Sequence, residues 1–424
     1  MHQISLNILK YVLKQLARLT IWRFEPDIIA ITGSVGKTSA KEAIFAVLSG
    51  YSNANGKKNV RKASENFNNE LGVPLTILGS WQKVERPLIF FWLKIIVISA
   101  LKLLFSFISR FNYPDILILE YGASKPGDIK YLLEIAQPKI AVVTAVGEVP
   151  VHIEFYSDVE AIAREKAKLI DDLSSLNWAV LNNDDNLVLA MKEKTRAQIL
   201  TFGFSSDSNL KITSFENRSE NNKPIGISFK FEKESSFVPV NLRGVFGKAH
   251  AYAAAIGALV GVIYGINLVE AAEALSANYK PAKARMNLIY GIKNSYIIDD
   301  SYNASPLSME SALETLKELE GERKIAILGD MLELGKYSIE AHESIGKLAA
   351  QSADILITVG PRGKFMADSA IISGLEKNKV LFFDTAEEAL NSIKKLLKKD
   401  DIILIKASHA VGLDKIVEEI KIAG

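Results

Sequence analysis

The 424-residue chain contains no cysteine, and its 51 Lys and Arg nearly balance its 49 Asp and Glu. Without cysteine it has no disulfide framework, no thiol nucleophile and no cysteine metal site. The net charge of +2 gives no overall reason to expect a nucleic-acid partner. No secretory signal is expected, because Lys10, Lys14 and Arg18 interrupt the apolar run that such a signal needs.

The order of apolar and amphipathic segments predicts an α/β fold with several domains. The chain is too long for one ordinary core, and apolar runs that alternate with helical segments are typical of a largely parallel sheet. We expect a basic amphipathic helix in residues 1–26, mainly over residues 4–22. A central domain is predicted over residues 27–281, with a β-rich stretch at 198–246, and a smaller α/β domain over residues 282–424.

A short glycine turn follows the first predicted strand and precedes a helix. Such a turn presents backbone N–H groups to phosphate oxygens, and an adjacent lysine and hydroxyl add a cation and a magnesium ligand. The usual phosphate loop has four residues between its glycines, whereas this turn has two, so it is either a shorter phosphate loop or a chance turn. The candidate nucleotide-binding residues are Gly33, Ser34, Val35, Gly36, Lys37, Thr38 and Ser39.

Three residues further along the chain are candidates for a metal site. Glu120 ends a predicted strand, where a carboxylate near the Thr38 hydroxyl suits magnesium, although a solvated strand-end glutamate is the plainer alternative. His152 precedes a predicted helix that contains Lys166. A lone histidine is more often structural than a ligand, and a protonated lysine cannot bind a cation.

Together these stretches resemble the Mur ligase family, whose members use ATP to join an amino acid or peptide to a carboxylate. Residues 66–78, 299–309 and 326–346 resemble signatures of the members that add D-alanyl-D-alanine. The resemblance implies a central P-loop-type ATPase domain with a parallel sheet, followed by a smaller Rossmann-like α/β domain. It also makes the short glycine loop a normal one.

The resemblance assigns roles to the candidate residues. Two magnesium ions would be held by Thr38, Glu120, His152 and Lys166, the last as a carbamate, which turns the amine into an anionic oxygen donor. The implied catalytic residues are Lys37, His152, Lys166 and Asn303. The other implied contacts are Arg285 and Asp300 with ATP, Asn303 with the incoming amine, and Asn66, Asn68 and Asn69 with substrate.

The implied reaction is amide formation through an acyl phosphate, with a peptidoglycan-precursor carboxylate as acceptor, in the cytoplasm. Few residues precede the phosphate-loop strand, so we expect no separate UDP-sugar-binding domain, and an acceptor that is lipid-linked or from another polymer stays open. His250 and Ala253 replace asparagines that are usual in the family, and His409 departs from a Lys-Gly-Ser-Arg-Gly pattern. These departures leave a non-catalytic nucleotide-binding scaffold as a further alternative.

An apolar stretch within an insertion at about residues 80–113 is long enough to span a membrane. A single crossing would separate Thr38 from Glu120, which are expected to share magnesium. We therefore predict that residues 88–109 form an amphipathic helix, paired with residues 4–22, on the cytoplasmic membrane face. The alternative is that the two helices pack only on each other or on the central domain.

Overall fold

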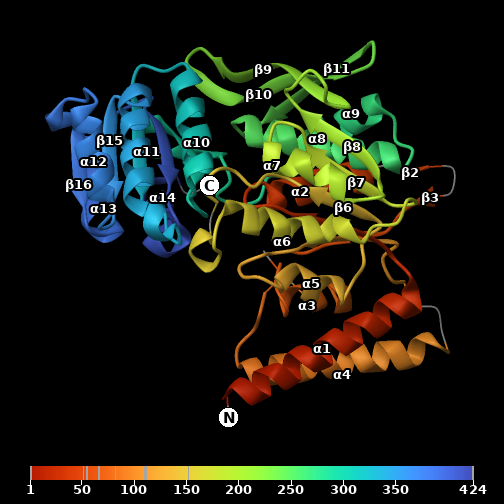
Figure 1. Cartoon of the computed structure of the whole chain (residues 1–424). Helices are drawn as coiled ribbons and strands as arrows, with labels where there is room; N and C mark the ends of the chain where they lie inside the picture. Colours follow the sequence, from red (N-terminus) through yellow and green to blue (C-terminus); the bar gives the residue numbers. More distant parts are fainter. Residues whose placement is uncertain are drawn as a thin grey trace. The chain divides into compact units, whose positions relative to one another are not determined.

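The computed structural model describes residues 2–50, 52–53, 56–64, 67–81, 83–108, 112–150 and 152–422 (Figure 1). The chain divides into two compact units. The first unit contains residues 1–146, 160–211 and 253–279, and the second contains residues 147–159, 212–252 and 280–424. The predicted domain boundary near residue 281 stays a prediction, since two earlier segments cluster with the C-terminal part.

The first unit is built on a parallel sheet. Its strand order is β4-β5-β1-β6-β7-β8, and every neighbouring pair in this series is parallel. The strands are β1 (Asp27–Thr32), β4 (Val60–Lys62), β5 (Ile116–Glu120), β6 (Ile140–Val143), β7 (Trp178–Asn182) and β8 (Gln198–Gly203). The central residues of β1, β5, β6 and β7 are fully buried, as expected for parallel strands that are covered on both faces, whereas β4 is only partly buried. The predicted parallel sheet is confirmed.

Helices surround this sheet, and one short hairpin lies outside it. The helices are α1 (His2–Phe24), α2 (Lys37–Gly50), α3 (Gly72–Leu78), α4 (Leu88–Ser106), α5 (Asp128–Leu133), α6 (Val159–Asp171), α7 (Asn186–Leu189) and α9 (Leu268–Asn278). The hairpin pairs β2 (Ser52–Asn53) with β3 (Gly56–Lys57). The helices predicted over residues 4–22 and 88–109 are α1 and α4, which lie side by side (Figure 1).

The second unit contains a six-stranded sheet of order β12-β13-β17-β14-β15-β16. Its strands are β12 (Asn287–Gly291), β13 (Ser295–Asp300), β14 (Lys324–Gly329), β15 (Ile355–Val359), β16 (Val380–Phe383) and β17 (Ile402–Lys406). Only β12 is antiparallel to its neighbour. Its helices are α10 (Pro306–Glu318), α11 (Ser338–Ser352), α12 (Gly363–Ile372), α13 (Ala386–Leu396) and α14 (Asp414–Ile420).

Two apolar cores cover the two faces of this second sheet. One core joins the sheet to α10, α11 and α12, and the other joins it to α13 and α14. This three-layer arrangement of a mostly parallel sheet between helices is the expected Rossmann-like architecture. The carboxyl ends of its parallel strands therefore meet at one edge, where a ligand crevice is expected.

The predicted β-rich stretch is also present, and a mostly buried helix follows it. Strands β9 (Leu210–Glu220), β10 (Lys223–Lys233) and β11 (Ser236–Arg243) follow one another, and β10 and β11 form an antiparallel hairpin. Helix α8 (Lys248–Ile263) follows them, and its alanines from Ala251 onward are buried.

Candidate nucleotide and ligase site

The glycine turn lies where β1 ends and α2 begins, at the carboxyl edge of the first sheet. Gly33 has φ +145°, and a Cβ there would collide with the Thr144 hydroxyl at the end of β6. Gly36 has φ +87°, a left-handed conformation that glycine adopts most easily. Lys37, the first residue of α2, donates from Nζ to the Gly33 carbonyl at 2.6 Å. The loop is thus folded tightly around the start of the helix.

Thr38 and Glu120 meet beside this loop, as the parallel-strand argument predicts. Residues Ile31 of β1 and Glu120 of β5 are paired in register, so the glutamate ends next to the loop. Thr38 Oγ1 donates to Glu120 Oε2 at 3.2 Å, and both side chains are buried. Glu120 Oε1 also lies 3.0 Å from the Nζ of Lys41, which is 1% exposed.

Lys166 occupies a buried position on α6 in the same unit. Burial and, to a smaller extent, the positive charge of Lys37 lower the pKa of its ammonium to about 7, while Glu165 opposes the change. A lysine with this pKa is about half neutral at pH 7. The neutral amine is the form that reacts with carbon dioxide, so the chemistry of the residue fits a carbamate.

The donor set of the first unit fits nucleotide phosphates and a magnesium ion. The Ser34 hydroxyl is buried and, among the described residues, has no hydrogen-bond partner. Backbone N–H groups of a glycine loop at a helix start attract phosphate oxygens, and a hydroxyl with a carboxylate suits magnesium. Over the described ranges, no three His, Cys, Asp or Glu side chains gather as a metal site.

The three candidate substrate asparagines have different outcomes. Asn66 lies outside the described residues. Asn69 Oδ1 accepts hydrogen bonds from the backbone of Leu71 and Gly72 at 3.1 and 2.9 Å, so it fixes the start of α3. The backbone carbonyl of Asn68 accepts a hydrogen bond from the backbone N–H of Gly122 at 2.7 Å. Because Gly122 lies two residues after Glu120 in the sequence, this bond holds Asn68 near the end of β5.

His152 belongs to the second unit, where it contacts another acidic residue. Its Nδ1 lies 2.6 Å from Glu333 Oε2, and both residues have positive φ angles, 69° and 63°. A carboxylate on one ring nitrogen of a metal-bound histidine orients the ring for coordination by the other nitrogen. Glu333 was not among the residues singled out from the sequence.

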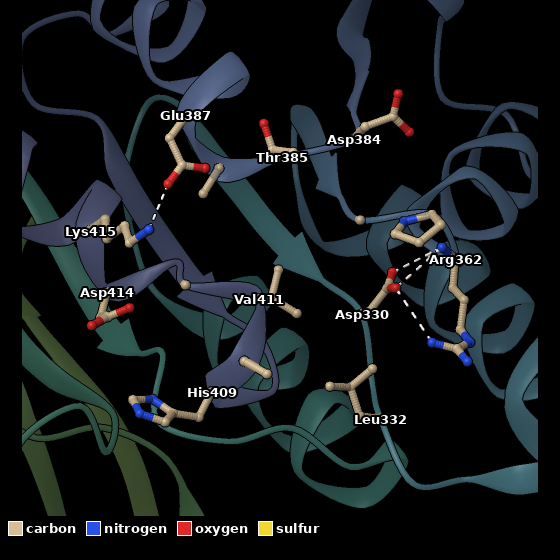
Figure 2. A pocket seen from close by; sticks show the side chains of 15 residues that line it. Asp330, Leu332, Arg362, Asp384, Thr385, Glu387, His409, Val411, Asp414 and Lys415 are labelled. Atoms are coloured by element: carbon tan, nitrogen blue, oxygen red, sulfur yellow. Dashed lines mark hydrogen bonds and ion pairs between the residues drawn. The ribbon is translucent and has the colours of Figure 1, made fainter.

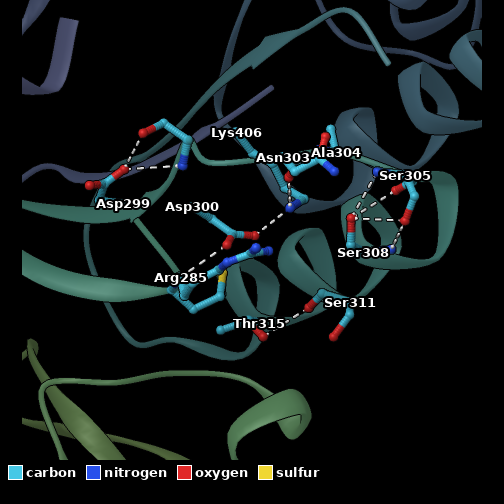
Figure 3. Close-up of polar contacts among 12 residues, drawn as sticks. Arg285, Asp299, Asp300, Asn303, Ala304, Ser305, Ser308, Ser311, Thr315 and Lys406 are labelled. Atoms are coloured by element: carbon cyan, nitrogen blue, oxygen red, sulfur yellow. Dashed lines mark hydrogen bonds and ion pairs between the residues drawn. The ribbon is translucent and has the colours of Figure 1, made fainter. Parts of the chain in front are cut away.

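Asp300 and Asn303 are brought together in the second unit by a buried lysine, and Arg285 lies close to Tyr302 in the same unit. Lys406 Nζ lies 2.5 Å from Asp300 Oδ2 and donates to the Asn303 carbonyl at 2.8 Å (Figure 3). Asp300 Oδ1 accepts from the backbone N–H of Met286 at 3.2 Å. The Arg285 guanidinium lies 4.2 Å from the centre of the Tyr302 ring. Lys406 thus holds Asp300 and Asn303 together. Arg285 lies next in sequence to Met286, whose backbone binds Asp300.

His250, which departs from the family pattern, has a structural role. Its Nε2 lies 2.9 Å from the carbonyl oxygen of Arg285, and burial lowers the pKa of the ring to about 4. The ring is therefore neutral at pH 7 and positions the backbone of Arg285. This contact with the Arg285 carbonyl gives a structural reason for a histidine at position 250, where an asparagine is usual in the family, that does not involve loss of activity.

A cavity of about 640 Å³ lies at the carboxyl edge of the second sheet (Figure 2). Asp330 follows β14 and Arg362 follows β15, and Arg362 donates its backbone N–H to Asp330 Oδ1 at 3.1 Å. Gly360 has φ +105°, and a Cβ there would collide with the Asp330 carboxyl. The charged and titratable residues that line the cavity are Asp330, Arg362, Asp384, Glu387, His409, Asp414 and Lys415.

Lys41, Lys406 and Arg362 were missed by the sequence reasoning. Lys41 follows Lys37 by one helical turn, and Lys406 ends an apolar strand. The position of each lysine in the sequence could therefore have indicated that it lies near the site. Their carboxylate partners are distant in sequence, at positions 120 and 300, and only the fold shows them.

A tight glycine loop, a lysine at the first turn of a helix and a Thr–Glu pair at the edge of a parallel sheet define a P-loop-type ATP-binding enzyme. The sequence matches the Mur ligase middle domain over residues 100–259 and the "Mur ligase, glutamate ligase domain" over residues 284–409. The chain belongs to the Mur ligase family and is an ATP-dependent, ADP-forming peptide ligase.

Individual relatives support the subgroup that the sequence suggested. The UDP-N-acetylmuramoyl-tripeptide--D-alanyl-D-alanine ligase of Rickettsia prowazekii is 31% identical over 409 residues, covering 92% of this chain and 77% of that protein. The enzyme of the same name from Bacillus subtilis is 29% identical over 410 residues, covering 96% and 79%. The crystal structure of MurF ligase from Thermotoga maritima in complex with ADP matches with a TM-score of 0.76 and 26% identity, over 97% of this chain and 83% of that one.

Proposed function

We propose that this ligase adds D-alanyl-D-alanine to UDP-N-acetylmuramoyl-tripeptide during peptidoglycan synthesis. The observation that carries the proposal is the phosphate loop with Thr38 Oγ1 at 3.2 Å from Glu120 Oε2, on a chain whose curated relatives bear that name. The loop supplies the site for ATP. The names of the relatives indicate the two substrates, a UDP-sugar tripeptide and a dipeptide.

Thr38, Glu120, His152 and Lys166 as a carbamate are the proposed magnesium ligands for two ions. Magnesium in such a site neutralises charge on the transferring phosphoryl group. Lys37 and the loop N–H groups do the same from the protein side. Lys41, paired with Glu120, keeps that carboxylate in place beside the loop.

The proposed reaction has two steps. A carboxylate oxygen of the tripeptide attacks the γ-phosphorus of ATP, the bond to the β-phosphate oxygen breaks, and ADP leaves. The free amine of the dipeptide then attacks the acyl carbon, loses a proton and expels phosphate, which leaves an amide bond. Arg285 and Asp300 are proposed to contact ATP, and Asn303 to lie near the amine.

The cavity in the second unit is our candidate for the dipeptide site. A free dipeptide carries one ammonium and one carboxylate, and the cavity presents both signs of charge. Arg362 is the proposed carboxylate partner, because a guanidinium binds a carboxylate through two parallel hydrogen bonds. The acidic residues Asp384 and Asp414 line the same cavity and suit the ammonium.

The proposal places the enzyme in the cytoplasm, with a peripheral membrane contact through residues 4–22 and 88–109. A lipid-linked acceptor, or an acceptor from another polymer, is the second candidate for the substrate. The extensive exposed apolar surface of α1 and α4 is the observation that favours a lipid-linked one.

Acceptor-dependent ADP release tests the function. Turnover should require UDP-N-acetylmuramoyl-tripeptide and D-alanyl-D-alanine together, and a lipid-linked precursor pool should be assayed beside them. Arg362→Met should raise the KM for the dipeptide about tenfold or more without changing the KM for ATP. If no precursor from either pool stimulates ADP release, the chain is a nucleotide-binding scaffold and the proposal is wrong.

A further inference from the structure

Helix α4 buries the face on which its serines lie. Four of its side chains are buried, Phe91, Ile95, Ser99 and Ser106, and they recur along one side of the helix. Ser106 Oγ donates to the Leu103 carbonyl at 2.7 Å, and the Ser106 carbonyl accepts from Arg23 Nη2 of α1 at 2.5 Å. The inward face of α4 therefore carries two buried serines beside the apolar Phe91 and Ile95.

The opposite face of α4 is apolar and exposed. Phe90 and Ile89 are 71% and 73% exposed, and the same outward stripe continues for nearly five turns. A helix in water usually places most of its apolar side chains inward, whereas α4 exposes this long apolar stripe beside the exposed Lys94 and Lys102. The outward stripe beyond Phe90 consists of Leu93, Val97, Leu101, Leu104 and Phe105.

Helix α1 exposes a similar apolar stripe beside it. Leu13, Ala17 and Thr20 are buried, while an exposed stripe runs along the other side and contains Ile8, Tyr11, Leu19 and Trp22. Leu13 packs in one cluster with Phe91 and Ile95 of α4 and with two leucines of α3. The two helices thus form a layer beside α3 (Figure 1), and the apolar side chains on the far side of this layer are exposed.

The charges of this layer are all positive. Helices α1 and α4 together contain six lysines and arginines and no aspartate or glutamate. Lys10 and Lys14 pair with Glu70 and Glu134, whereas Arg18 and Lys102 are exposed, and Lys94 is exposed and lies 3.8 Å from the exposed Glu85 carboxylate. Cations around an apolar surface are complementary to a bilayer that contains anionic phospholipids.

The fold excludes a membrane crossing by α4, although its length and composition alone would allow one. Strand β1 precedes α4 and strand β5 follows it, and these strands pair side by side in one sheet. Thr38 lies in the helix that follows β1, and Glu120 is the last residue of β5. The side chains of these two residues are hydrogen-bonded to each other. Both ends of α4 therefore return to the same side of any membrane.

We propose that the α1–α4 layer docks in one leaflet of an anionic phospholipid membrane, lying parallel to its surface. The outward leucines, valine and phenylalanines enter the acyl region, and Tyr11 and Trp22 lie at the level of the headgroups, where such side chains are enriched. Arg18, Lys94 and Lys102 contact lipid phosphates. The argument stands on this surface alone and does not require the ligase activity.

Vesicle flotation tests the proposal, with the full chain and without nucleotide or acceptor. Vesicles of phosphatidylcholine with phosphatidylglycerol should carry the protein at low salt, and vesicles of phosphatidylcholine alone should carry much less. In a variant with Leu93→Gln, Val97→Gln, Leu101→Gln and Leu104→Gln, the partition coefficient into these vesicles should fall by about a hundredfold or more. Lipids brominated at defined acyl depths should quench the fluorescence of Trp22, most strongly when the bromine lies nearest the headgroup. This part of the quenching should be missing in a Trp22→Phe variant.

The control variant is Leu176→Gln with Ile372→Gln, two exposed apolar residues outside the layer, which should float like the parent. Thermal unfolding shows that each variant is folded. The proposal fails if the parent stays unbound with anionic vesicles or if the four-glutamine variant floats equally well. A parent that stays unbound and sediments as a dimer, which the four-glutamine variant does not form, would assign this surface to a second copy of the chain.

Discussion

Lys166 is predicted to destabilise the folded protein at neutral pH while it serves the reaction. Burial lowers the pKa of its ammonium from the ordinary 10.5 to about 7. Each tenfold change in an acid constant corresponds to about 1.4 kcal/mol, so this lowering corresponds to about 5 kcal/mol. Replacing Lys166 with the uncharged Met should therefore raise the free energy of unfolding by about 3–5 kcal/mol below pH 7.

The sign of the pH dependence follows from proton binding. Between pH 7 and 10.5 the unfolded chain holds the proton on Lys166 and the folded chain does not, so the stability of the parent rises with pH across this window. The advantage of Lys166→Met should shrink over the same window. Lys168→Met is the matched control, because Lys168 lies on the same helix with a side chain 40% exposed.

Urea unfolding in buffers free of carbon dioxide, from pH 6 to pH 10, measures these differences. Lys166→Ala should also lose nearly all amide formation, and acetate should restore part of it by occupying the position of the carbamate. Two results would refute the reasoning. One is equal stability of Lys166→Met and the parent at pH 6, and the other is an active Lys166→Ala enzyme at ordinary magnesium concentrations.

Three further changes have defined outcomes. Lys37→Ala should lower kcat about a hundredfold or more in an ADP-release assay, because it removes the cation that lies at the phosphate loop, while the urea midpoint stays nearly unchanged. Gly33→Ala should raise the KM for ATP and lower stability by about 1–3 kcal/mol, because the new Cβ collides with the Thr144 hydroxyl. Arg323→Met should lower stability by about 2–4 kcal/mol in chemical denaturation, since it leaves the buried Asp401 carboxylate without its paired guanidinium.

Much of the first unit was predictable because parallel strands place their carboxyl ends together. The apolar run before Gly33 and the one that ends in Glu120 were enough to predict that the loop and the carboxylate meet. The structure confirms this, with Thr38 and Glu120 in contact. Resemblance to a family supplied Lys166 and His152, for which spacing alone offered no reason.

The missed residues depend on tertiary packing. Nothing in the sequence near Lys406 indicates Asp300, its partner 106 residues away, and the same holds for Lys41 and Glu120. The sequence of α4 showed an apolar and a more polar face but not which one faces the protein. That orientation is set by α1 and α3, which cover the side with Ser99 and Ser106.

The central claim is ligation through an acyl phosphate formed from the acceptor carboxylate. UDP-N-acetylmuramoyl-tripeptide labelled with oxygen-18 in the reacting carboxyl group should be incubated with ATP, magnesium and D-alanyl-D-alanine, and the phosphate analysed by mass spectrometry. The account predicts one labelled oxygen in each phosphate released, with amide product and ADP in equal amounts. Phosphate released without label in the presence of both substrates would show that ATP is hydrolysed by water, and it would contradict the account.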